Sequence, residues 1–302
     1  MRSVRIRVPA SAANLGPGFD SLAVALDLHN ELEVEVIDGK LEIQVEGEGE
    51  GHLPTDASNL IARAAYRLFR TAGISAPGMH IRSINRIPLG SGLGSSAAAI
   101  VAGLMVAEAL ADSGLTREQL LEIAWEMEGH ADNAAAAVYG GLMVVGRSAG
   151  HLMTAQIPLA PMRFAVVTPE IALPTHELRD MLPRNVTLHD AALNLGRMGL
   201  MVEALRKGDF NLISGAAKDR LHEPYRSPLI PGFVEARSLG LEAGAAAVTL
   251  TGAGPSLIAF APDHHELIAD AMASVFHKHN LQVRKFVLDP EPRGAQVLSS
   301  AH

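Results

Sequence analysis

A glycine-rich stretch, Pro88-Leu89-Gly90-Ser91-Gly92-Leu93-Gly94-Ser95-Ser96, constrains the fold of this chain more than any other segment. Three glycines in five residues let the backbone bend sharply and come close to a ligand. The stretch runs directly into an Ala-rich apolar segment, residues 97–111, so the two serines stand where a helix should begin. A helix start offers free N–H groups and a partial positive charge, and both attract phosphate. The stretch therefore predicts a phosphate-binding loop in a protein that handles nucleotides.

The spacing of this loop differs from the two best-known phosphate loops. A Walker A loop needs G-x-x-x-x-G-K-[ST], and this stretch contains no lysine. The dinucleotide pattern G-x-G-x-x-G also fails, because Ser95 takes the position of the last glycine. A catalytic cation must therefore come from elsewhere in the chain or from a bound metal.

Composition excludes several classes of protein. The 302 residues are enough for one large domain or two medium ones. A net charge of −8 at pH 7 argues against a general nucleic-acid binder, whose affinity rests on clustered Lys and Arg. The absence of cysteine excludes disulfides, thiolate catalysis and cysteine-based zinc sites.

No segment predicts export or membrane insertion. Residues 1–7 alternate apolar and charged side chains, which is typical of a strand and unlike the apolar core of a signal peptide. The longest apolar run, residues 97–111, contains Glu108 and is too short to span a bilayer. We therefore expect a cytoplasmic protein with neither nucleic acid nor membrane as a partner.

Strand and helix patterns are mixed along the chain. Residues 4–8, 32–36 and 41–45 alternate as half-buried strands do, and Asp38-Gly39 predicts a hairpin between the last two. We expect helices at 59–71, 96–111, 116–128, 175–181, 188–206, 233–243 and from 263 onwards, and further strands at 164–167, 247–250, 257–260 and 283–288.

This order lacks a strict βαβ rhythm and favours an α+β fold over a doubly wound parallel sheet. A composition shift at Pro158–Pro161 predicts a boundary between two domains, residues 1–160 and 161–302. The tail after Pro290 shows no pattern of regular structure.

Two polar clusters lie in the first half of the chain. The segment from Pro9 to Asp20 holds a Gly-Pro-Gly turn, and it is either a surface turn or a pocket wall in which Asp20 binds a substrate cation. The segment from Glu126 to Asn133 crowds acids and a histidine at one helix end. It is either a solvated terminus or a site for Mg²⁺, which prefers oxygen ligands, and no histidine spacing there predicts zinc.

Two further clusters lie in the second half. Thr251-Gly252-Ala253-Gly254-Pro255-Ser256 has more glycine than a plain hairpin needs, which indicates a second glycine loop that supports a ligand or the first loop. Arg179 and Arg226 are either solvated or, if they converge on a pocket, suited to bind a substrate carboxylate.

Taken together, these segments resemble the GHMP kinase superfamily, named for galactokinase, homoserine kinase, mevalonate kinase and phosphomevalonate kinase. The three superfamily motifs correspond to Pro9–Asp20, Pro88–Ser96 and Leu250–Ser256. Within it, the homoserine kinase family is the most similar, on residues 11–20, Glu128-Gly129-His130-Ala131-Asp132-Asn133 and Asp219–Arg226. The resemblance runs to about Leu288. Its one departure is Ala131, where the family often has proline.

The resemblance implies a two-domain α+β fold, with an N-terminal domain like ribosomal protein S5 domain 2 and a ferredoxin-like C-terminal domain. It implies an ATP-dependent phosphotransferase with an alcohol acceptor, in which Mg²⁺ assists transfer of the γ-phosphoryl group to the side-chain hydroxyl of L-homoserine. The product is O-phospho-L-homoserine, a precursor of threonine. Homodimers are usual in the family.

The resemblance also assigns residues to roles. ATP would be bound by Asn59, near adenine, by Pro88, Leu89, Gly90, Ser91, Gly92, Leu93, Gly94, Ser95 and Ser96, and by Gly252 and Gly254. Mg²⁺ would contact Ser96 and Glu128, with Ser95 and Glu126 as the alternatives. For the amino acid, Asp20 would pair with the ammonium group, Arg179 and Arg226 with the carboxylate, and Asn14 and Asn133 with the hydroxyl.

Catalysis would rest on Asn133, Ser96 and Glu128 without a strong protein base, and Asp132 would be mainly structural. Two alternatives stay open. One is another kinase of the superfamily acting on a mevalonate-like or sugar alcohol, and the other is a non-catalytic amino-acid or nucleotide sensor on the same fold. The absence of a lysine near the glycine loops weighs against mevalonate kinase, and the pairing of Asp20 with Arg179 and Arg226 weighs against sugars and isoprenoid alcohols.

Overall fold

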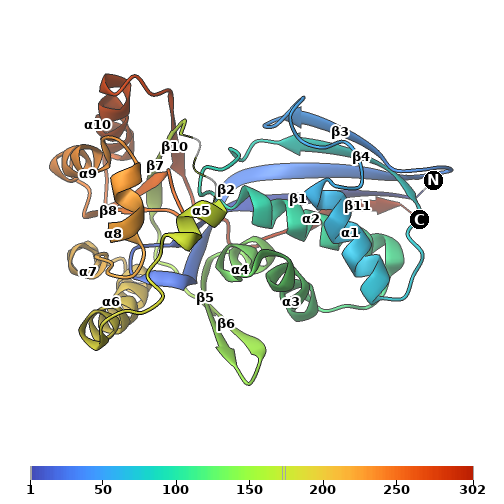
Figure 1. The fold of residues 1–302 in the computed structure, drawn as a ribbon, viewed down its shortest axis with the longest axis horizontal. Coiled ribbons are helices and arrows are strands. Elements are labelled where there is room, and N and C mark those ends of the chain that lie inside the picture. The colour runs from blue at the N-terminus through green and yellow to red at the C-terminus, as the bar shows by residue number, and fades with distance from the viewer. Residues whose placement is uncertain (1, 172, 174, 302) are drawn as a thin grey trace.

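The structure, a computed structural model, describes residues 2–171, 173 and 175–301, and it contains two β-sheets (Figure 1). The first sheet has the strand order β11-β1-β2-β4-β3, and β5 pairs with β2 and with β6. Its strands are β1 (Ser3–Asn14), β2 (Gly18–Ile37), β3 (Glu42–Gly47), β4 (Gly78–Asn85), β5 (Leu142–Ser148), β6 (His151–Ile157) and β11 (Gln296–Ala301).

Helices α1 (Leu60–Thr71), α2 (Ser95–Ala111), α3 (Arg117–Glu128) and α4 (Asp132–Tyr139) cover one face of this sheet (Figure 1). The opposite face carries ion pairs across the strands, such as Arg82 with Glu33 at 2.8 Å. This division follows from the alternation along each strand, since every second side chain points to the same face.

Helix α2 runs through the middle of the helical layer, and its packing places the glycine-rich loop. A Cβ on Gly103 would lie 2.2 Å from the backbone oxygen of Ile61, so glycine is needed for α1 and α2 to come this close. The apolar residues of α2 surround the helix rather than forming one stripe, because it is buried between α1, α4 and β1.

The second sheet is antiparallel in the order β10-β7-β9-β8. Its strands are β7 (Arg163–Pro169), β8 (Ala247–Leu250), β9 (Leu257–Ala261) and β10 (Val283–Leu288). The helices of this half are α5 (Thr175–Asp180), α6 (Leu188–Lys207), α7 (Phe210–Ala216), α8 (Glu223–Arg226), α9 (Phe233–Glu242) and α10 (His265–Lys278), with a 3₁₀ turn at Ser227–Leu229.

Strand β7 shows how the two halves share a core. Phe164 and Val166 point into a cluster that continues to the first sheet and its helices. Ala165 and Val167 point to the other side, into a cluster with α9 and α10. Both faces of the second sheet are therefore buried, which explains the continuous apolar run that marks β7 in the sequence.

The α+β class predicted from the sequence is confirmed, but the Asp38-Gly39 hairpin is wrong. Strands β2 and β3 do not pair, because β4 lies between them, antiparallel to β2 and parallel to β3. The chain crosses over the start of β4, where a Cβ on Gly78 would lie 2.4 Å from the oxygen of Gly39. The chain does bend at Asp38-Gly39, but the strand that pairs with β2 in the sheet is β4 and not β3.

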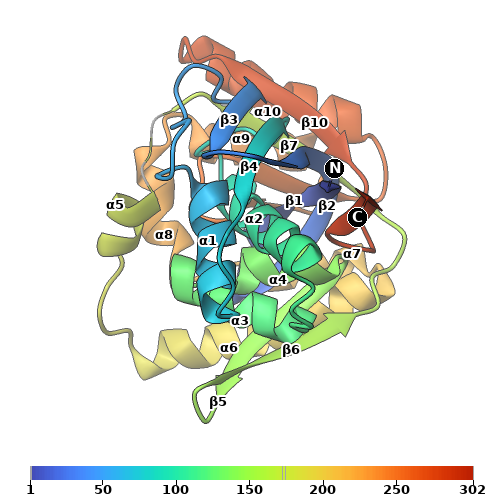
Figure 2. The ribbon, with the colours of Figure 1, turned by 90° about the vertical axis from the view of Figure 1, so that its right-hand side faces the viewer.

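The expectation of a patternless tail after Pro290 is also wrong. Strand β11 pairs antiparallel with β1, and Figure 2 views the molecule from the end where both termini lie. The division at residue 160 stays a prediction, and β11 is a part of the second half that joins the first sheet.

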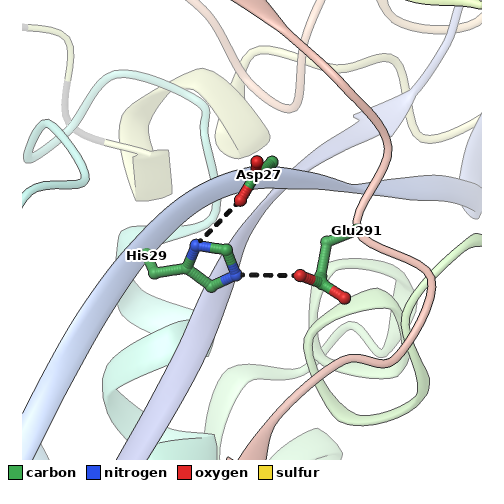
Figure 3. A group of neighbouring side chains, drawn as sticks. All are labelled: Asp27, His29 and Glu291. Carbon is green, nitrogen blue, oxygen red and sulfur yellow. Dashed lines mark hydrogen bonds and ion pairs between the residues drawn. The ribbon is translucent and has the colours of Figure 1, made fainter.

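The segment before β11 is fixed to β2 by a partly buried histidine. The ring of His29 lies between two carboxylates, with Nδ1 3.3 Å from Asp27 and Nε2 3.2 Å from Glu291 (Figure 3). The backbone N–H of Glu291 donates to Ala25. Both ring nitrogens are thus engaged, and the contact with Glu291 joins the segment before β11 to β2.

Within the described residues, we find no helix with the length and apolar character that crossing a membrane requires.

Candidate active site

A cleft of about 460 Å³ lies where the two halves meet, and residues from both line it. Most of the predicted site residues are among them: Asn14, Asp20, Gly90, Ser91, Gly92, Gly94, Ser95, Ser96, Glu128, Asn133, Arg179, Arg226 and Gly252. Pro88, Leu89, Leu93, Asn59 and Gly254 do not line it. The cleft therefore gathers residues from β1, β2, the glycine-rich loop, α3, α4, α5, α8 and the β8–β9 loop.

The glycine-rich loop is held by the second glycine loop. The Thr251 hydroxyl donates to the Gly92 carbonyl at 2.9 Å, and the Ser256 N–H donates to the Ser91 carbonyl at 3.1 Å. A Cβ on Gly92 would lie 2.3 Å from the Thr251 oxygen. Thr251–Ser256 thus supports the first loop, which is one of the two roles considered for it.

Helix α2 begins at Ser95 with its positive end free of a side-chain cap. Gly94 is the N-cap residue at φ +70°, and it makes no side-chain hydrogen bond. The first N–H groups of a helix have no partner inside the helix, so this end favours an anion. Because Ser95 and Ser96 line the cleft, the loop and the helix start present an anion-binding surface there.

Glu128 and Ser96 form a group suited to a divalent cation. Oxygen Oε2 of Glu128 is buried without a hydrogen-bond partner among the described residues. Burial raises the pKa of Glu128, although the charge of His130 and the Ser96 hydroxyl oppose the shift. A buried carboxylate oxygen without a partner beside a hydroxyl fits Mg²⁺, which takes oxygen ligands. Glu126 lies outside the cleft, where it pairs with Arg67 at 2.6 Å.

The start of α4 holds a short polar network. The Asn133 N–H donates to Asp132 at 2.8 Å, and the His130 ring lies 3.3 Å from the same carboxylate oxygen. Burial opposes the charged form of His130, but the hydrogen bond and charge of Asp132 and the charge of Glu128 outweigh it and raise its pKa. Asp132 is buried and lines the cleft, and its Oδ1 receives both of these contacts.

Asn133 connects α4 to the glycine-rich loop. Its Oδ1 accepts a hydrogen bond from the Ser11 hydroxyl at 2.9 Å and lies 3.0 Å from where a Cβ on Gly94 would stand. The Asn133 amide nitrogen makes no hydrogen bond to any residue that the structure describes, and Asn133 lines the cleft. Asn133 is therefore positioned beside the anion-binding surface.

Asp20 and Arg179 form a bidentate ion pair, with guanidinium–carboxylate distances of 2.8 and 3.0 Å. Both side chains are more than one-third exposed. Pairs this exposed contribute about 0–1 kcal/mol to stability. The sequence suggested that each would meet a substrate charge, and the structure shows them meeting one another.

Arg226 is buried, at 2% exposure, and its charge is compensated weakly. Its Nη1 donates to the Gly252 carbonyl at 3.3 Å, the same oxygen to which Asn14 donates at 2.8 Å. Burial lowers the pKa of Arg226 to about 10, with a further contribution from the charge of Arg179. No carboxylate lies within ion-pair distance of Arg226 among the residues that the structure describes, so the cleft holds a buried cation.

Asn59 has a different place from the cleft residues. Its Oδ1 accepts from the Ile61 N–H as the N-cap of α1, and its Nδ2 donates to the Pro54 carbonyl. The next residue, Leu60, lines the cleft. The contact of Asn59 with adenine stays a prediction.

Sequence reasoning missed Leu60, Arg63, Ile100 and Met127 as lining residues, and it treated His130 only as part of a cluster. Leu60, Ile100 and Met127 follow helical spacing like any core residue. Arg63 stands on an exposed helix face, where a lone arginine gives no signal of a site.

Comparisons with known proteins agree with this geometry. The family described as "GHMP kinases N terminal domain" matches residues 59–141, and "GHMP kinases C terminal" matches residues 201–278. A homoserine kinase of Caldanaerobacter subterraneus subsp. tengcongensis is 41% identical, over 98% of this chain and 96% of its own. One of Moorella thermoacetica is 39% identical, over 97% and 99%. The crystal structure of homoserine kinase from Cytophaga hutchinsonii superimposes with a TM-score of 0.89 at 33% identity, covering 98% and 97%.

Proposed function

Because this chain belongs to the homoserine kinases of the GHMP kinase family, we propose that it transfers the γ-phosphoryl group of ATP to the side-chain hydroxyl of L-homoserine. The product is O-phospho-L-homoserine. The chain is a kinase of this family, and the family uses ATP with Mg²⁺.

One observation carries the choice of acceptor. The cleft brings an anionic residue, Asp20, together with two arginines, Arg179 and Arg226. An amino-acid zwitterion offers an ammonium group and a carboxylate at a fixed separation, and this set matches both charges. Sugars and isoprenoid alcohols offer no such pair.

The ion pair of Asp20 and Arg179 is partly exposed, so a substrate can separate the two side chains and bind to both. Opening the pair forfeits little, because the interaction is partly solvated. Asp20 would then bind the ammonium group, while Arg179 and the buried Arg226 would bind the carboxylate. The zwitterion replaces one ion pair by two and gives the Arg226 charge the partner it lacks in the chain.

The nucleotide would be bound along the glycine-rich loop. Backbone N–H groups of residues 90–96 and the start of α2 would hold the triphosphate, and Ser96 and Glu128 would contact Mg²⁺. The shape of this loop would depend on Pro88, Leu89 and Leu93. The second glycine loop would support it through Gly252 and Gly254, which pack against Gly92. Bound Mg²⁺ would neutralise charge on the transferring phosphoryl group.

Phosphoryl transfer depends mainly on positioning and charge stabilisation, because its transition state is loose. Asn133 stands beside the glycine-rich loop and Asn14 beside Gly252, so the two amides would orient the acceptor hydroxyl. Asp132 already accepts from the Asn133 N–H and faces His130. We therefore assign Asp132 to holding the start of α4, and not to proton abstraction.

The test is ADP release with MgATP, measured in parallel with homoserine, mevalonate, galactose and shikimate as acceptors. We expect turnover with homoserine far above the other three. Turnover of another acceptor with none on homoserine would refute the assignment, and ATP binding without turnover of any acceptor would favour a sensor.

We also propose a homodimer in the cytoplasm, on the family resemblance alone. Light scattering coupled to size-exclusion chromatography measures the assembly, and a mass equal to one chain would contradict the dimer.

A further inference from the structure

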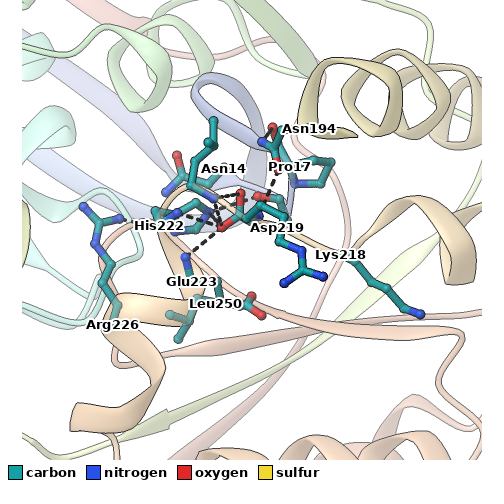
Figure 4. Close-up of polar contacts among 12 residues, drawn as sticks. Asn14, Pro17, Asn194, Lys218, Asp219, His222, Glu223, Arg226 and Leu250 are labelled. Atoms are coloured by element: carbon teal, nitrogen blue, oxygen red, sulfur yellow. Dashed lines mark hydrogen bonds and ion pairs between the residues drawn. The ribbon is translucent and has the colours of Figure 1, made fainter. Parts of the chain in front are cut away.

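His222 is a fully buried histidine near the cleft that the proposed mechanism does not use. Its exposure is 0%, and it lies on the loop that leads into α8 (Figure 4). Its Nε2 lies 2.9 Å from the Gly16 carbonyl, in the turn between β1 and β2. Its Nδ1 lies 3.5 Å from Nη1 of Arg226.

The chemistry of the two partners fixes the tautomer. A guanidinium offers only donors, so Nδ1 must accept from Arg226 with its lone pair. A carbonyl oxygen only accepts, so Nε2 carries the proton and donates to Gly16. Burial and the Arg226 charge lower the pKa of His222, against the opposing charges of Asp219 and Asp20, and this agrees with a neutral ring.

A ring stack joins His222 to the amino-acid end of the cleft. The Phe19 and His222 rings have centroids 5.3 Å apart at an interplanar angle of 21°. The guanidinium carbons of Arg226 and Arg179 lie 5.4 and 5.7 Å from the Phe19 ring centroid. Because Phe19 precedes Asp20, one stack borders all three charged residues that match a zwitterion.

The backbone around His222 is itself held in place. The Asp219 carboxylate accepts from the N–H groups of His222 and Glu223, each at 2.8 Å. Asn194 donates to the Pro17 carbonyl at 2.8 Å and accepts from the Arg220 N–H at 2.9 Å, so it joins the turn to the loop (Figure 4). These contacts therefore fix the position of the His222 ring beside Arg226.

We propose that His222 is a positioning residue for Arg226: its Nδ1 accepts one guanidinium N–H and thereby orients the remaining donors of Arg226 toward the substrate carboxylate. The Gly252 and Leu178 carbonyls accept at 3.3 and 3.4 Å, and Nδ1 of His222 lies at 3.5 Å, so three contacts of similar length together orient the Arg226 guanidinium. The inference rests on the proposed function, in which Arg226 binds the carboxylate of homoserine.

Two substitutions separate the two ring nitrogens. In His222→Asn the amide oxygen can stand near the Nδ1 position and accept from Arg226, while the donor to Gly16 is lost. In His222→Gln the longer side chain can place its amide N–H near the Nε2 position and donate to Gly16, while the acceptor for Arg226 is lost. The exposed His277→Gln is the matched control for loss of an imidazole.

We expect His222→Gln to raise the KM for homoserine about 10-fold, since a hydrogen bond to a charged group is worth roughly that factor or more. The KM for ATP should stay within about 2-fold, and His222→Asn should restore most of the homoserine KM. In an Arg226→Gln background, His222→Gln should change the homoserine KM little, because its partner is gone.

Equal rises in homoserine KM for the two His222 variants, equal effects on the ATP and homoserine KM, or additivity with Arg226→Gln would overturn the inference. Its failure is distinguishable from failure of the proposed function. ¹⁵N NMR of the wild type reports whether His222 is the Nε2–H tautomer without any substrate. A protonated Nδ1, or an unmoved Arg226 in a crystal structure of His222→Gln, would contradict it even if homoserine is not the acceptor.

Discussion

Alanine at Gly92 should separate the two glycine loops, and alanine at Gly90 should not. Both residues lie in the same loop with positive φ, at +83° and +60°. The Cβ of an alanine at Gly92 would meet the Thr251 oxygen at 2.3 Å and the Gly254 oxygen at 3.0 Å. The Cβ at Gly90 would have no atom within 4 Å, so Gly90→Ala is a matched control for backbone strain alone.

The magnitudes follow from these contacts. A left-handed conformation strains a non-glycine residue by about 1–2 kcal/mol, and this applies at both positions. At Gly92 the overlap is with backbone that no rotamer change can remove, and overpacking of this kind costs about 1–3 kcal/mol. Weakening the hydrogen bond from Thr251 to Gly92 adds about 1 kcal/mol. We expect a loss in unfolding free energy of about 3–6 kcal/mol for Gly92→Ala against about 1–2 kcal/mol for Gly90→Ala.

The assay is thermal unfolding without ligand, so that effects on ATP binding do not enter. At about 2 °C per kcal/mol for a chain of this size, Gly92→Ala should lower Tm by about 6–12 °C and Gly90→Ala by about 2–4 °C. Equal shifts for the two variants would refute the reasoning, because the Thr251 contact is the difference between them that the structure identifies.

Three further outcomes are expected. Glu128→Gln should raise the Mg²⁺ concentration needed for half-maximal activity at least about 10-fold, yet raise Tm slightly without Mg²⁺, because burial raises the pKa of Glu128 and disfavours its charge; a Mg²⁺ titration and a melting curve measure both. Asp132→Asn should lower kcat by less than about 10³-fold across a pH–rate profile, whereas a larger loss would indicate base catalysis, typically worth 10²–10⁴. Burial would raise the pKa of Glu291, but hydrogen bonds and charge from Arg293 and the charge of His29 outweigh it and lower the pKa. The ionised Glu291 therefore stabilises the folded state at pH values above the pKa of the unfolded chain. This stabilisation is lost as the pH falls through the lower pKa of the folded chain. The stability difference between wild type and Glu291→Gln should therefore shrink between about pH 7 and about pH 3, as followed by urea unfolding.

The glycine-rich loop could be predicted because its requirement is local. Positive φ at Gly90, Gly92 and Gly94, followed by serines and an apolar helix, is a property of neighbouring residues and is visible in the sequence. The helix at 60–71 and the capping box at Thr116 are local in the same way.

What the sequence did not provide is long-range pairing. Asp20 and Arg179 are 159 residues apart, and local signals assign each a charge but not one another as partners. The role of His222 could not be predicted for the same reason. Its contacts with Gly16 and Phe19 exist only in the folded chain, because those residues are about 200 positions away in the sequence. The hairpin predicted at Asp38-Gly39 was wrong because a local turn signal does not specify which strands pair, and β4 lies between β2 and β3.

The pairing of β11 with β1 has a consequence for how the protein is made. These strands lie far apart in the sequence, so the first sheet acquires β11 only after residues 296–301 have left the ribosome. Until then β1 presents an unpaired edge, through the whole synthesis of the second half. A contact between residues this distant in sequence also closes late in folding. The nascent N-terminal half thus carries a sheet edge open to pairing with other chains until β11 covers it.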